Sequence, residues 1–397
     1  MRALLLASLI AISACSSSDD APPATSDAGP TGPRVVPAGA AAWEKAGEHP
    51  VGHAIFTAKD AARDRTLTLQ LWYPAAPSVV DAVKAGTPME ELVVDPKDRA
   101  TMARLLAAAP DACTRKRVAS VKDPPPAAGR WPVVAFSHCH SCVRFSMAQI
   151  AERLASHGFA VIAPDHAGDT VFDAERGAAA PLNGEFLAVR AADIRFSLDV
   201  VLGTAGEAAN EAVPAPLRGK LDADKVGVFG HSYGAATTGL VLARDARPKA
   251  GLAIAAPMEN DLLPPAKMAE IKVPALLLVA REDNSISEIG NNLMRSNFKR
   301  GNPPLFLLEV EDAGHWSFSD TCALTKSFVA GCGEGLRQTE SGTPFFYLEN
   351  AGARALAASY VTAFFAAHLR ADAAAKAFLV APLGGDPSGV VTAASRE

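Results

Sequence analysis

The 397-residue chain is 49% hydrophobic and 20% charged, which is typical of a globular protein and excludes a collagen-like, coiled-coil or disordered chain. Its 38 lysines and arginines stand against 43 aspartates and glutamates, so the formal charge is −5. A chain with this charge has no bulk attraction for nucleic acid or acidic lipid, and neither is expected as a partner.

Residues 1–14 have the pattern of an export signal. Arg2 precedes an apolar run over 3–12, which is too short to span about 30 Å of hydrocarbon but suits a signal peptide. Residues 12–15, ISAC, resemble a bacterial lipobox, in which the cysteine receives the lipid. We predict a lipid anchor at Cys15 as the sole membrane attachment of a protein at the outer membrane or cell surface. The alternative is ordinary cleavage nearby and a periplasmic or secreted protein.

Residues 15–45 are predicted to be the lipid anchor and a disordered linker, because 16–42 are mostly Ser, Pro, Ala, Gly and Asp with almost nothing to bury. From about residue 50, short apolar runs alternate with helical stretches, which predicts a parallel sheet covered by helices. No linker divides the rest. We therefore predict one catalytic domain over 46–372 and a C-terminal extension over 373–397.

Eight strands are predicted, over residues 52–57, 66–73, 133–137, 160–163, 226–229, 251–255, 275–279 and 305–310. The first two carry polar residues as an antiparallel edge hairpin would, and the later ones are continuous apolar runs that fit strands buried on both faces. Helices are predicted over 146–156, 190–202, 232–244, 285–298 and 353–368. The predicted fold class is α/β, with a mostly parallel eight-stranded sheet and helices on both faces.

The segment 81–126 interrupts this alternation as an insertion. It is rich in Ala, Asp, Lys and Pro, contains a predicted helix over 102–108 and ends in three prolines. Because it lacks a clear amphipathic stripe, we predict a surface excursion rather than a lid.

Disulfides are expected because an exported protein can hold them. Five cysteines follow the lipobox, and Cys322 and Cys332, ten residues apart in a Gly-rich stretch, are the predicted pair. Cys113 with Cys139 or Cys142 is the next candidate. Cys139 and Cys142 lack a second ligand pair at zinc spacing, so no metal site is predicted.

A G-x-S-x-G pentapeptide stands between a predicted strand and a predicted helix. Residues 230–234, GHSYG, form a turn so tight that its glycine positions must lack side chains, and it presents the serine above the sheet in a strained conformation. We predict Ser232 as a nucleophile. The alternative is a Gly-rich turn without catalysis.

A serine hydroxyl is a poor nucleophile at neutral pH and needs a histidine base that an acid orients. Two histidines follow Ser232. His315 lies just beyond the last predicted strand, where a loop can return it to the serine, whereas His368 is explained as a solvated helix end. Asp283 follows the seventh predicted strand and is the predicted acid, with the neighbouring Glu282 as its competitor.

Acyl transfer also needs backbone donors for the oxyanion. One is predicted to be the amide of Tyr233, at the positive end of the helix that follows the nucleophile. The second is expected in the loop after the strand at 133–137. The acyl pocket is predicted to be lined by Met258, His231 and Trp316, together with Tyr233.

Three stretches resemble one branch of the α/β-hydrolases. VVAFSH at 133–138, LASHGFAVIAPDH at 154–166 and GHSYG at 230–234 are similar to platelet-activating-factor acetylhydrolases and dienelactone-hydrolase-like enzymes, to which bacterial lipases and polyester hydrolases are related. The likeness covers most of 50–370. It implies esterase chemistry without a metal or organic cofactor, and it places the second oxyanion donor at the His140 amide.

The chain departs from that branch in two places. Cys139 stands where the branch has the glycine of Ser-His-Gly, and its side chain restricts the backbone, so a disulfide through Cys139 or Cys142 is expected to fix the loop instead. The acetylhydrolases place their acid one strand earlier, where residues 252–257 have no carboxylate. This moves the acid to Asp283, as in the dienelactone and polyester hydrolases, and weakens phospholipid specificity.

The sequence therefore predicts a lipid-anchored serine hydrolase that cleaves short-acyl, lipid-like or polyester carboxylic esters through an acyl-enzyme intermediate. A lipase, a thioesterase or a peptidase on the same fold is the alternative. From another class, the alternative is a catalytically silent surface-binding lipoprotein, against which the complete Ser, Asp and His set argues. No oligomeric state is predicted.

Overall fold

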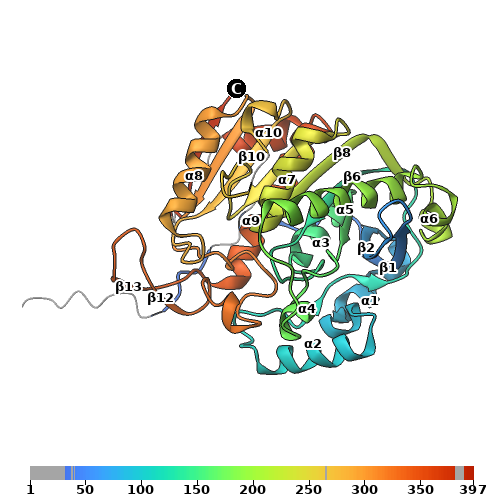
Figure 1. The fold of residues 1–397 in the computed structure, drawn as a ribbon, viewed down its shortest axis with the longest axis horizontal. Helices are drawn as coiled ribbons and strands as arrows, with labels where there is room; N and C mark the ends of the chain where they lie inside the picture. Colours follow the sequence, from blue (N-terminus) through green and yellow to red (C-terminus); the bar gives the residue numbers. More distant parts are fainter. Residues whose placement is uncertain (1–31, 37–38, 40, 264–265, 381–388) are drawn as a thin grey trace, which may run out of the picture. The chain divides into compact units, whose positions relative to one another are not determined.

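The computed structural model describes residues 32–36, 39, 41–263, 266–380 and 389–397. The predicted signal peptide and Cys15 lie outside these residues. A mixed sheet forms the centre of the described domain (Figure 1). It has ten strands in the order β14-β11-β10-β9-β8-β6-β7-β2-β1-β5. The predicted α/β architecture is confirmed, and the sheet is wider than predicted.

All of the predicted strands are present: β1 (Val51–Asp60), β2 (Arg65–Pro74), β6 (Trp131–Ser137), β7 (Ala160–Pro164), β8 (Leu221–His231), β9 (Pro248–Ile254), β10 (Ala275–Ala280) and β11 (Leu305–Val310). The neighbours from β7 through β6, β8, β9 and β10 to β11 are parallel. The β1–β2 and β2–β7 pairs are antiparallel, as expected for the hairpin at the start of the domain.

Two further strands make the sheet ten-stranded rather than eight-stranded. β5 (Val121–Lys122) pairs with β1 over two residues, and β14 (Val391–Arg396) pairs antiparallel with the whole of β11. The segment predicted as a C-terminal extension thus supplies a strand that satisfies the backbone groups at the β11 edge. Its sequence, VTAASR, has no apolar run that would predict a strand.

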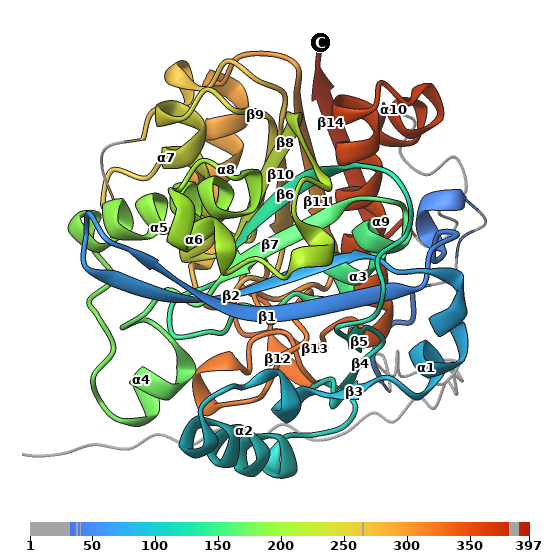
Figure 2. The same cartoon turned by 90° about the vertical axis from the view of Figure 1, so that its right-hand side faces the viewer.

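The five predicted helices cover both faces of the sheet: α3 (Ala148–Ser156), α5 (Gly184–Leu202), α7 (Tyr233–Arg244), α8 (Ser287–Arg300) and α9 (Asn350–Leu369). Apolar residues of α3 and α9 form one buried cluster with one face of the sheet, and residues of α5, α7 and α8 form a second cluster with the other. Figure 2 shows the two groups of helices on either side of the strands. Shorter elements are α1 (Val80–Ala85), α2 (Pro96–Ala108), α4 (Val171–Glu175), α6 (Glu207–Glu211), α10 (Ala373–Val380), β3 (Thr87–Pro88), β4 (Arg117–Val118), β12 (Glu334–Leu336) and β13 (Pro344–Phe346).

The insertion predicted at 81–126 folds against the domain through α2. This helix begins after Asp95, whose side chain accepts the N–H groups of residues 97 and 98, and it buries an apolar face. The backbone N–H of Arg115 donates to the carbonyl of Asp320 at 2.9 Å. The insertion is therefore packed against the segment between β11 and α9, which carries His315.

The described residues contain two disulfides, and both predicted pairings, Cys322 with Cys332 and Cys113 with Cys139 or Cys142, are wrong. Cys332 is bonded to Cys113, and Cys139 is bonded to Cys142, with Cα atoms 5.7 and 5.2 Å apart. Cys322 is a fully buried free thiol. The prediction used spacing along the chain, whereas the folded insertion brings Cys113 to a partner 219 residues away.

Disulfides are typical of exported proteins. None of the described helices has both the length and the apolar character needed to cross a membrane.

We expect a non-reducing peptide map to link the peptides of Cys113 and Cys332 and to leave Cys322 unpaired. Burial raises the pKa of the Cys322 thiol to about 12, so in the native protein at pH 8 it should resist alkylation and react only after unfolding. Replacing both linked cysteines with serine should lower the free energy of unfolding by roughly 2–5 kcal/mol. A Cys322–Cys332 peptide would contradict this pairing.

Candidate active site

The turn from β8 to α7 holds Ser232 in a strained backbone conformation. Its φ is +56° and its ψ is −121°, and its N–H donates to the carbonyl of Ile254 at 2.9 Å. A Cβ on Gly230 would lie 2.0 Å from the Gly234 carbonyl oxygen, and one on Gly234 would lie 1.9 Å from the carbonyl oxygen of Ser137. Both glycines of the pentapeptide are therefore required by close backbone contacts, and the turn raises Ser232 at the carboxyl end of the sheet.

The structure brings His315 and Asp283 together. His315 Nδ1 lies 2.7 Å from Asp283 Oδ2, and both side chains are buried. The other oxygen, Oδ1, accepts the N–H groups of Ser285 and Ile286 at 3.0 Å each. These two bonds fix the carboxylate in one orientation, so Asp283 can orient the imidazole as the acid of a catalytic triad does.

His315 lies against the residue that precedes Ser232. His231 donates through Nε2 to the His315 carbonyl at 2.8 Å, and the two rings have centroids 4.9 Å apart. Burial, followed by the charge of His315, holds the pKa of His231 well below its usual range, so His231 is neutral. The alternative acid and the alternative base have other partners. Glu282 accepts the N–H of Gln338 at 2.8 Å, and the ring of His368 packs against aromatic residues of β11 and α9.

The two candidate oxyanion donors come from neighbouring segments. Tyr233 is the first residue of α7, and the first amides of a helix have no acceptor within it. His140 belongs to residues 138–142, here called the oxyanion loop, which follows β6. The rings of His140 and Tyr233 have centroids 6.1 Å apart. The disulfide expected to shape this loop is present between Cys139 and Cys142.

A cavity of about 230 Å³ opens beside Ser232. Apolar side chains form most of its wall, and the lining residues are Leu182, Ser232, Tyr233, Ala236, Ala256, Pro257, Asn260, Leu262, Leu263, Ile286, Ile289, Gly290 and Leu293. The predicted lining residues Met258, Trp316 and His231 do not line this cavity. Met258 and His231 are buried, and Trp316 stacks on Phe328 at 3.9 Å between ring centroids. The loop after β9 and the start of α8 line it instead.

Comparison with known proteins places the chain in a family of hydrolases. A model of the dienelactone hydrolase family matches residues 118–369, which is more than half of the chain. The chain belongs to the dienelactone hydrolase family. A model of platelet-activating factor acetylhydrolase, isoform II, matches residues 39–176. No protein of curated function matches the chain.

Among solved structures, this member of the dienelactone hydrolase family is similar to a ferulic acid esterase from Streptomyces cinnamoneus. The two share 25% sequence identity with a TM-score of 0.63, and the match covers 87% of this chain and 97% of the esterase. The family match and the similarity to the solved esterase structure show that the chain has an α/β-hydrolase fold and is a hydrolase.

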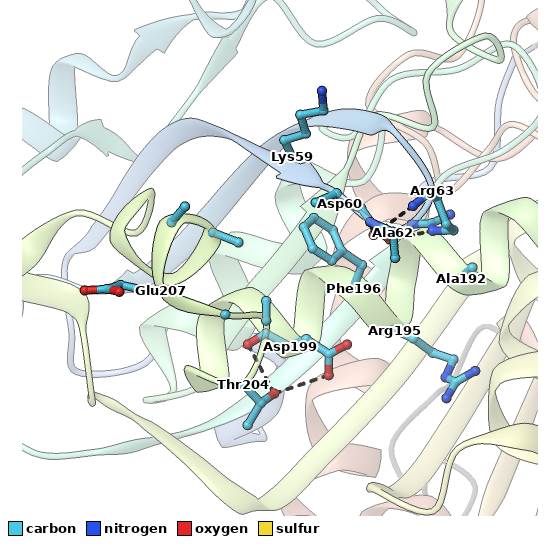
Figure 3. Close-up of a pocket in the computed structure, with 15 residues that line it drawn as sticks. Lys59, Asp60, Ala62, Arg63, Ala192, Arg195, Phe196, Asp199, Thr204 and Glu207 are labelled. Carbon is cyan, nitrogen blue, oxygen red and sulfur yellow. Dashed lines mark hydrogen bonds and ion pairs between the residues drawn. The ribbon is translucent and has the colours of Figure 1, made fainter.

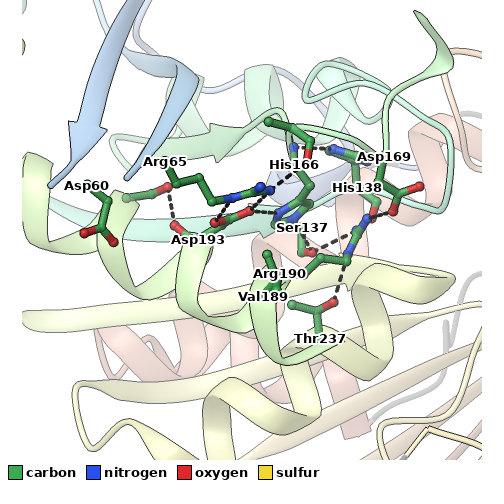
Figure 4. Close-up of polar contacts among 12 residues, drawn as sticks. Asp60, Arg65, Ser137, His138, His166, Asp169, Val189, Arg190, Asp193 and Thr237 are labelled. Carbon is green, nitrogen blue, oxygen red and sulfur yellow. Dashed lines mark hydrogen bonds and ion pairs between the residues drawn. The ribbon is translucent and has the colours of Figure 1, made fainter. Parts of the chain in front are cut away.

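Sequence reasoning missed a buried polar network under the oxyanion loop of this dienelactone hydrolase family member (Figure 4). Arg190 of α5 and Asp169, which follows β7, form an ion pair with both side chains fully buried. His166 lies 3.0 Å from Ser137 Oγ and 3.1 Å from an oxygen of Asp193. Burial, followed by the charge of Arg190, lowers the pKa of His166 to about 4. The sequence signals were polar residues at the carboxyl end of a strand and charged residues within an otherwise apolar helix.

A second hollow, of about 690 Å³, lies between the β1–β2 hairpin and the helices α5 and α6 (Figure 3). None of the predicted site residues lines it. Most of its charged residues have partners within the fold, such as Asp60 with Arg63 at 2.5 Å. Within the part of the chain that the structure describes, no group of three or more His, Cys, Asp or Glu side chains is placed to hold a metal ion.

Proposed function

We propose that the protein is a serine hydrolase of carboxylic esters with Ser232 as nucleophile, His315 as base and Asp283 as the orienting acid. One observation carries the proposal: the His315–Asp283 pair has 2.7 Å between Nδ1 and Oδ2, and the His315 carbonyl is hydrogen-bonded to His231, the residue next to Ser232. The ferulic acid esterase that the chain resembles is an ester hydrolase by name. Both facts favour acyl transfer over a binding role.

In the proposed mechanism, His315 Nε2 takes the hydroxyl proton of Ser232 as Oγ attacks the ester carbonyl carbon. The amides of Tyr233 and His140 stabilise the oxyanion that forms. His315 then gives its proton to the departing alcohol oxygen, which leaves an acyl-enzyme. Water repeats the sequence: His315 takes its proton, the hydroxide oxygen attacks the acyl carbon, and the proton returns to Ser232 as the acid leaves.

A substrate panel on the purified protein tests the reaction class. We expect hydrolysis of short p-nitrophenyl esters to exceed that of matched anilides and thioesters. Faster turnover of the anilide would favour a peptidase, and faster turnover of the thioester would favour a thioesterase. A folded protein that turns over none of them would support the non-catalytic alternative.

The cavity beside Ser232 favours a small apolar acyl or aryl group. Its volume of about 230 Å³ is below the roughly 300–1,000 Å³ of sites for drug-sized ligands. The Tyr233 hydroxyl, which could have offered polar contact, donates instead to the carbonyl of Asn183 at 2.5 Å. Leu182, Leu262 and Ile289 line the cavity and are 50%, 84% and 75% exposed, so an apolar rim surrounds its mouth. We propose that the acyl group fills the cavity and that the rim contacts the apolar remainder of the substrate.

Enlarging Ala236 tests this orientation. Ala236 is buried one turn after Ser232 and lines the cavity. The variant Ala236→Leu should lower kcat/KM for p-nitrophenyl hexanoate by about 10-fold or more, because its added methyl groups occupy acyl space, while the acetate ester changes by no more than about threefold. Equal losses for both esters would contradict the assignment of the cavity to the acyl group. The variant Leu240→Ile, on the same helix and outside the cavity lining, is the control.

We also propose that the chain is exported and lipidated at Cys15 and that a linker joins this anchor to the catalytic domain. The linker is shorter than the predicted 15–45, because Trp43, in the short helix Ala42–Glu44, packs against the buried core of the domain. The two disulfides support export. In a bacterial host, the variant Cys15→Ala should leave the membrane fraction, while the unaltered protein stays in it. Equal release of both would favour ordinary signal cleavage and a periplasmic or secreted protein.

A further inference from the structure

The oxyanion loop, residues 138–142, has a backbone that its own sequence does not favour. It contains no glycine, and Ser141 has a φ of +55°, in the left-handed region. The disulfide between Cys139 and Cys142 closes a small ring around His140 and Ser141. A strained loop of this kind keeps one conformation when surrounding groups hold it.

Asp169 holds this loop from below. Its side chain is fully buried, and Oδ1 accepts the N–H of Ser141 at 2.9 Å. The same oxygen lies 2.7 Å from His140 Nδ1. Burial raises the pKa of Asp169, but the interactions with His140 and Arg190 outweigh it and leave the pKa below its ordinary value. An ionised carboxylate therefore contacts two consecutive residues of the loop, Ser141 and the candidate donor His140.

Arg190 joins the oxyanion loop to α7. Its guanidinium pairs with Asp169 Oδ2 and donates to the carbonyl of His138 at the start of the loop. Its Nε donates to Thr237 Oγ1 of α7 at 3.3 Å, and its central carbon lies 4.6 Å from the ring centroid of Tyr233. One buried guanidinium thus contacts the loop that carries one candidate donor and the helix that carries the other (Figure 4).

His138 adds a second restraint on the loop. Its Nε2 accepts the N–H of His166 at 3.0 Å, so Nδ1 carries the proton and donates to the carbonyl of Cys139 at 2.7 Å. Burial, followed by the charge of Arg190, holds the pKa of His138 well below its usual range and keeps it neutral. The two carbonyls that precede His140 are therefore both held by buried side chains.

We propose that the Asp169–Arg190 ion pair is the positioning element of the oxyanion hole and sets the relative placement of the His140 and Tyr233 amides. The inference rests on the proposed function. Neither residue touches the reacting atoms. Because oxyanion donors act mainly on the transition state, loss of the pair should lower kcat and leave KM nearly unchanged.

The test compares Asp169→Asn, Arg190→Met and the double variant with p-nitrophenyl butyrate as substrate. Each single change leaves a buried charge without its partner and costs stability, whereas the double change removes both charges. We expect kcat of the double variant to fall about 10- to 10³-fold with KM within about threefold. The Ki of phenylboronic acid, whose adduct with the serine places an oxygen in the oxyanion hole, should rise in parallel.

Two further variants separate positioning from folding. Arg190→Lys keeps the charge opposite Asp169 but loses the planar fork that reaches both segments, so it should fold and still show the lower kcat. Glu152→Gln is the matched control: Glu152 is a buried carboxylate that pairs with Arg115 at 2.7 Å and accepts the N–H of Ser120 at 2.8 Å. It should lose stability and keep kcat.

Wild-type kcat in the folded double variant or in Arg190→Lys would overturn the inference. An equal loss of kcat in Glu152→Gln would also overturn it, since the effect would then be one of stability. If the unaltered protein hydrolyses no ester and binds no boronate, the proposed function fails first and the inference fails with it.

Discussion

Replacing Ser232 with alanine is expected to lower kcat for p-nitrophenyl butyrate by at least about 10⁴-fold. Alanine has no atom that can form the acyl-enzyme, so neither His315 nor the oxyanion donors have a reaction to assist. The strained turn is held by the close contacts of Gly230 and Gly234, which the substitution does not alter. Initial rates of the purified variant measure the loss, and circular dichroism checks that it is folded.

The exposed Ser285 provides the control for this substitution, because it lies close to the site and its hydroxyl has no role in the proposed chemistry. Ser285→Ala should keep kcat within about twofold, as surface changes usually do. A folded Ser232→Ala protein that retains a tenth of the original kcat would show that the serine is not the nucleophile.

Replacing Asp283 with asparagine should cost about 10⁴-fold in kcat. The N–H groups of Ser285 and Ile286, each 3.0 Å from Oδ1, will hold the amide oxygen of the asparagine at that position. The amide nitrogen then faces His315 Nδ1 and favours the tautomer with the proton on Nε2, which cannot accept the proton of Ser232. The rate is measured at constant pH, and the thermal midpoint tests whether the fold is intact.

Glu282→Gln is the matched control for the acid. Glu282 is buried like Asp283, but it accepts from Gln338 and lies 3.2 Å from the guanidinium of Arg337. Its loss should loosen the β12–β13 hairpin and lower the thermal midpoint while kcat stays within about threefold. A loss of kcat as large as that of Asp283→Asn would show that the assignment of the acid to Asp283 is wrong.

The sheet was predictable where the strands are buried on both faces. Residues 226–229 and 276–279 are continuous apolar runs, which fit strands covered by helices on both sides, and both runs lie in parallel strands. The turn that carries the proposed nucleophile was predictable for a related reason. The tight turn at 230–234 requires glycines at fixed spacing, so a short stretch of sequence is enough to predict its geometry.

Features that depend on distant parts of the chain were not predictable. β14 is a short segment of small and polar residues that becomes a strand because the edge of β11 offers it hydrogen-bond partners. Cys113 and Cys332 are joined because the insertion packs against the segment that carries His315. Neither relation leaves a local pattern.

The acyl cavity and the Asp169–Arg190 pair share this property. The cavity takes most of its walls from the loop after β9 and from the start of α8, and of the four residues predicted to line it, Tyr233 alone does so. Arg190 stands in the middle of a helix and contacts two segments that are far from it along the chain. A charged residue in an apolar helix signals a buried partner without saying which one.

Fluorophosphonate labelling followed by peptide mass spectrometry tests the central claim most directly. The reagent forms a stable bond to a serine that a neighbouring base has activated. We predict one adduct, on the peptide that contains Ser232, and greatly reduced labelling in the His315→Ala variant. A folded protein that takes up no label, or takes it up at another residue, would contradict the assignment of Ser232 and His315 as nucleophile and base.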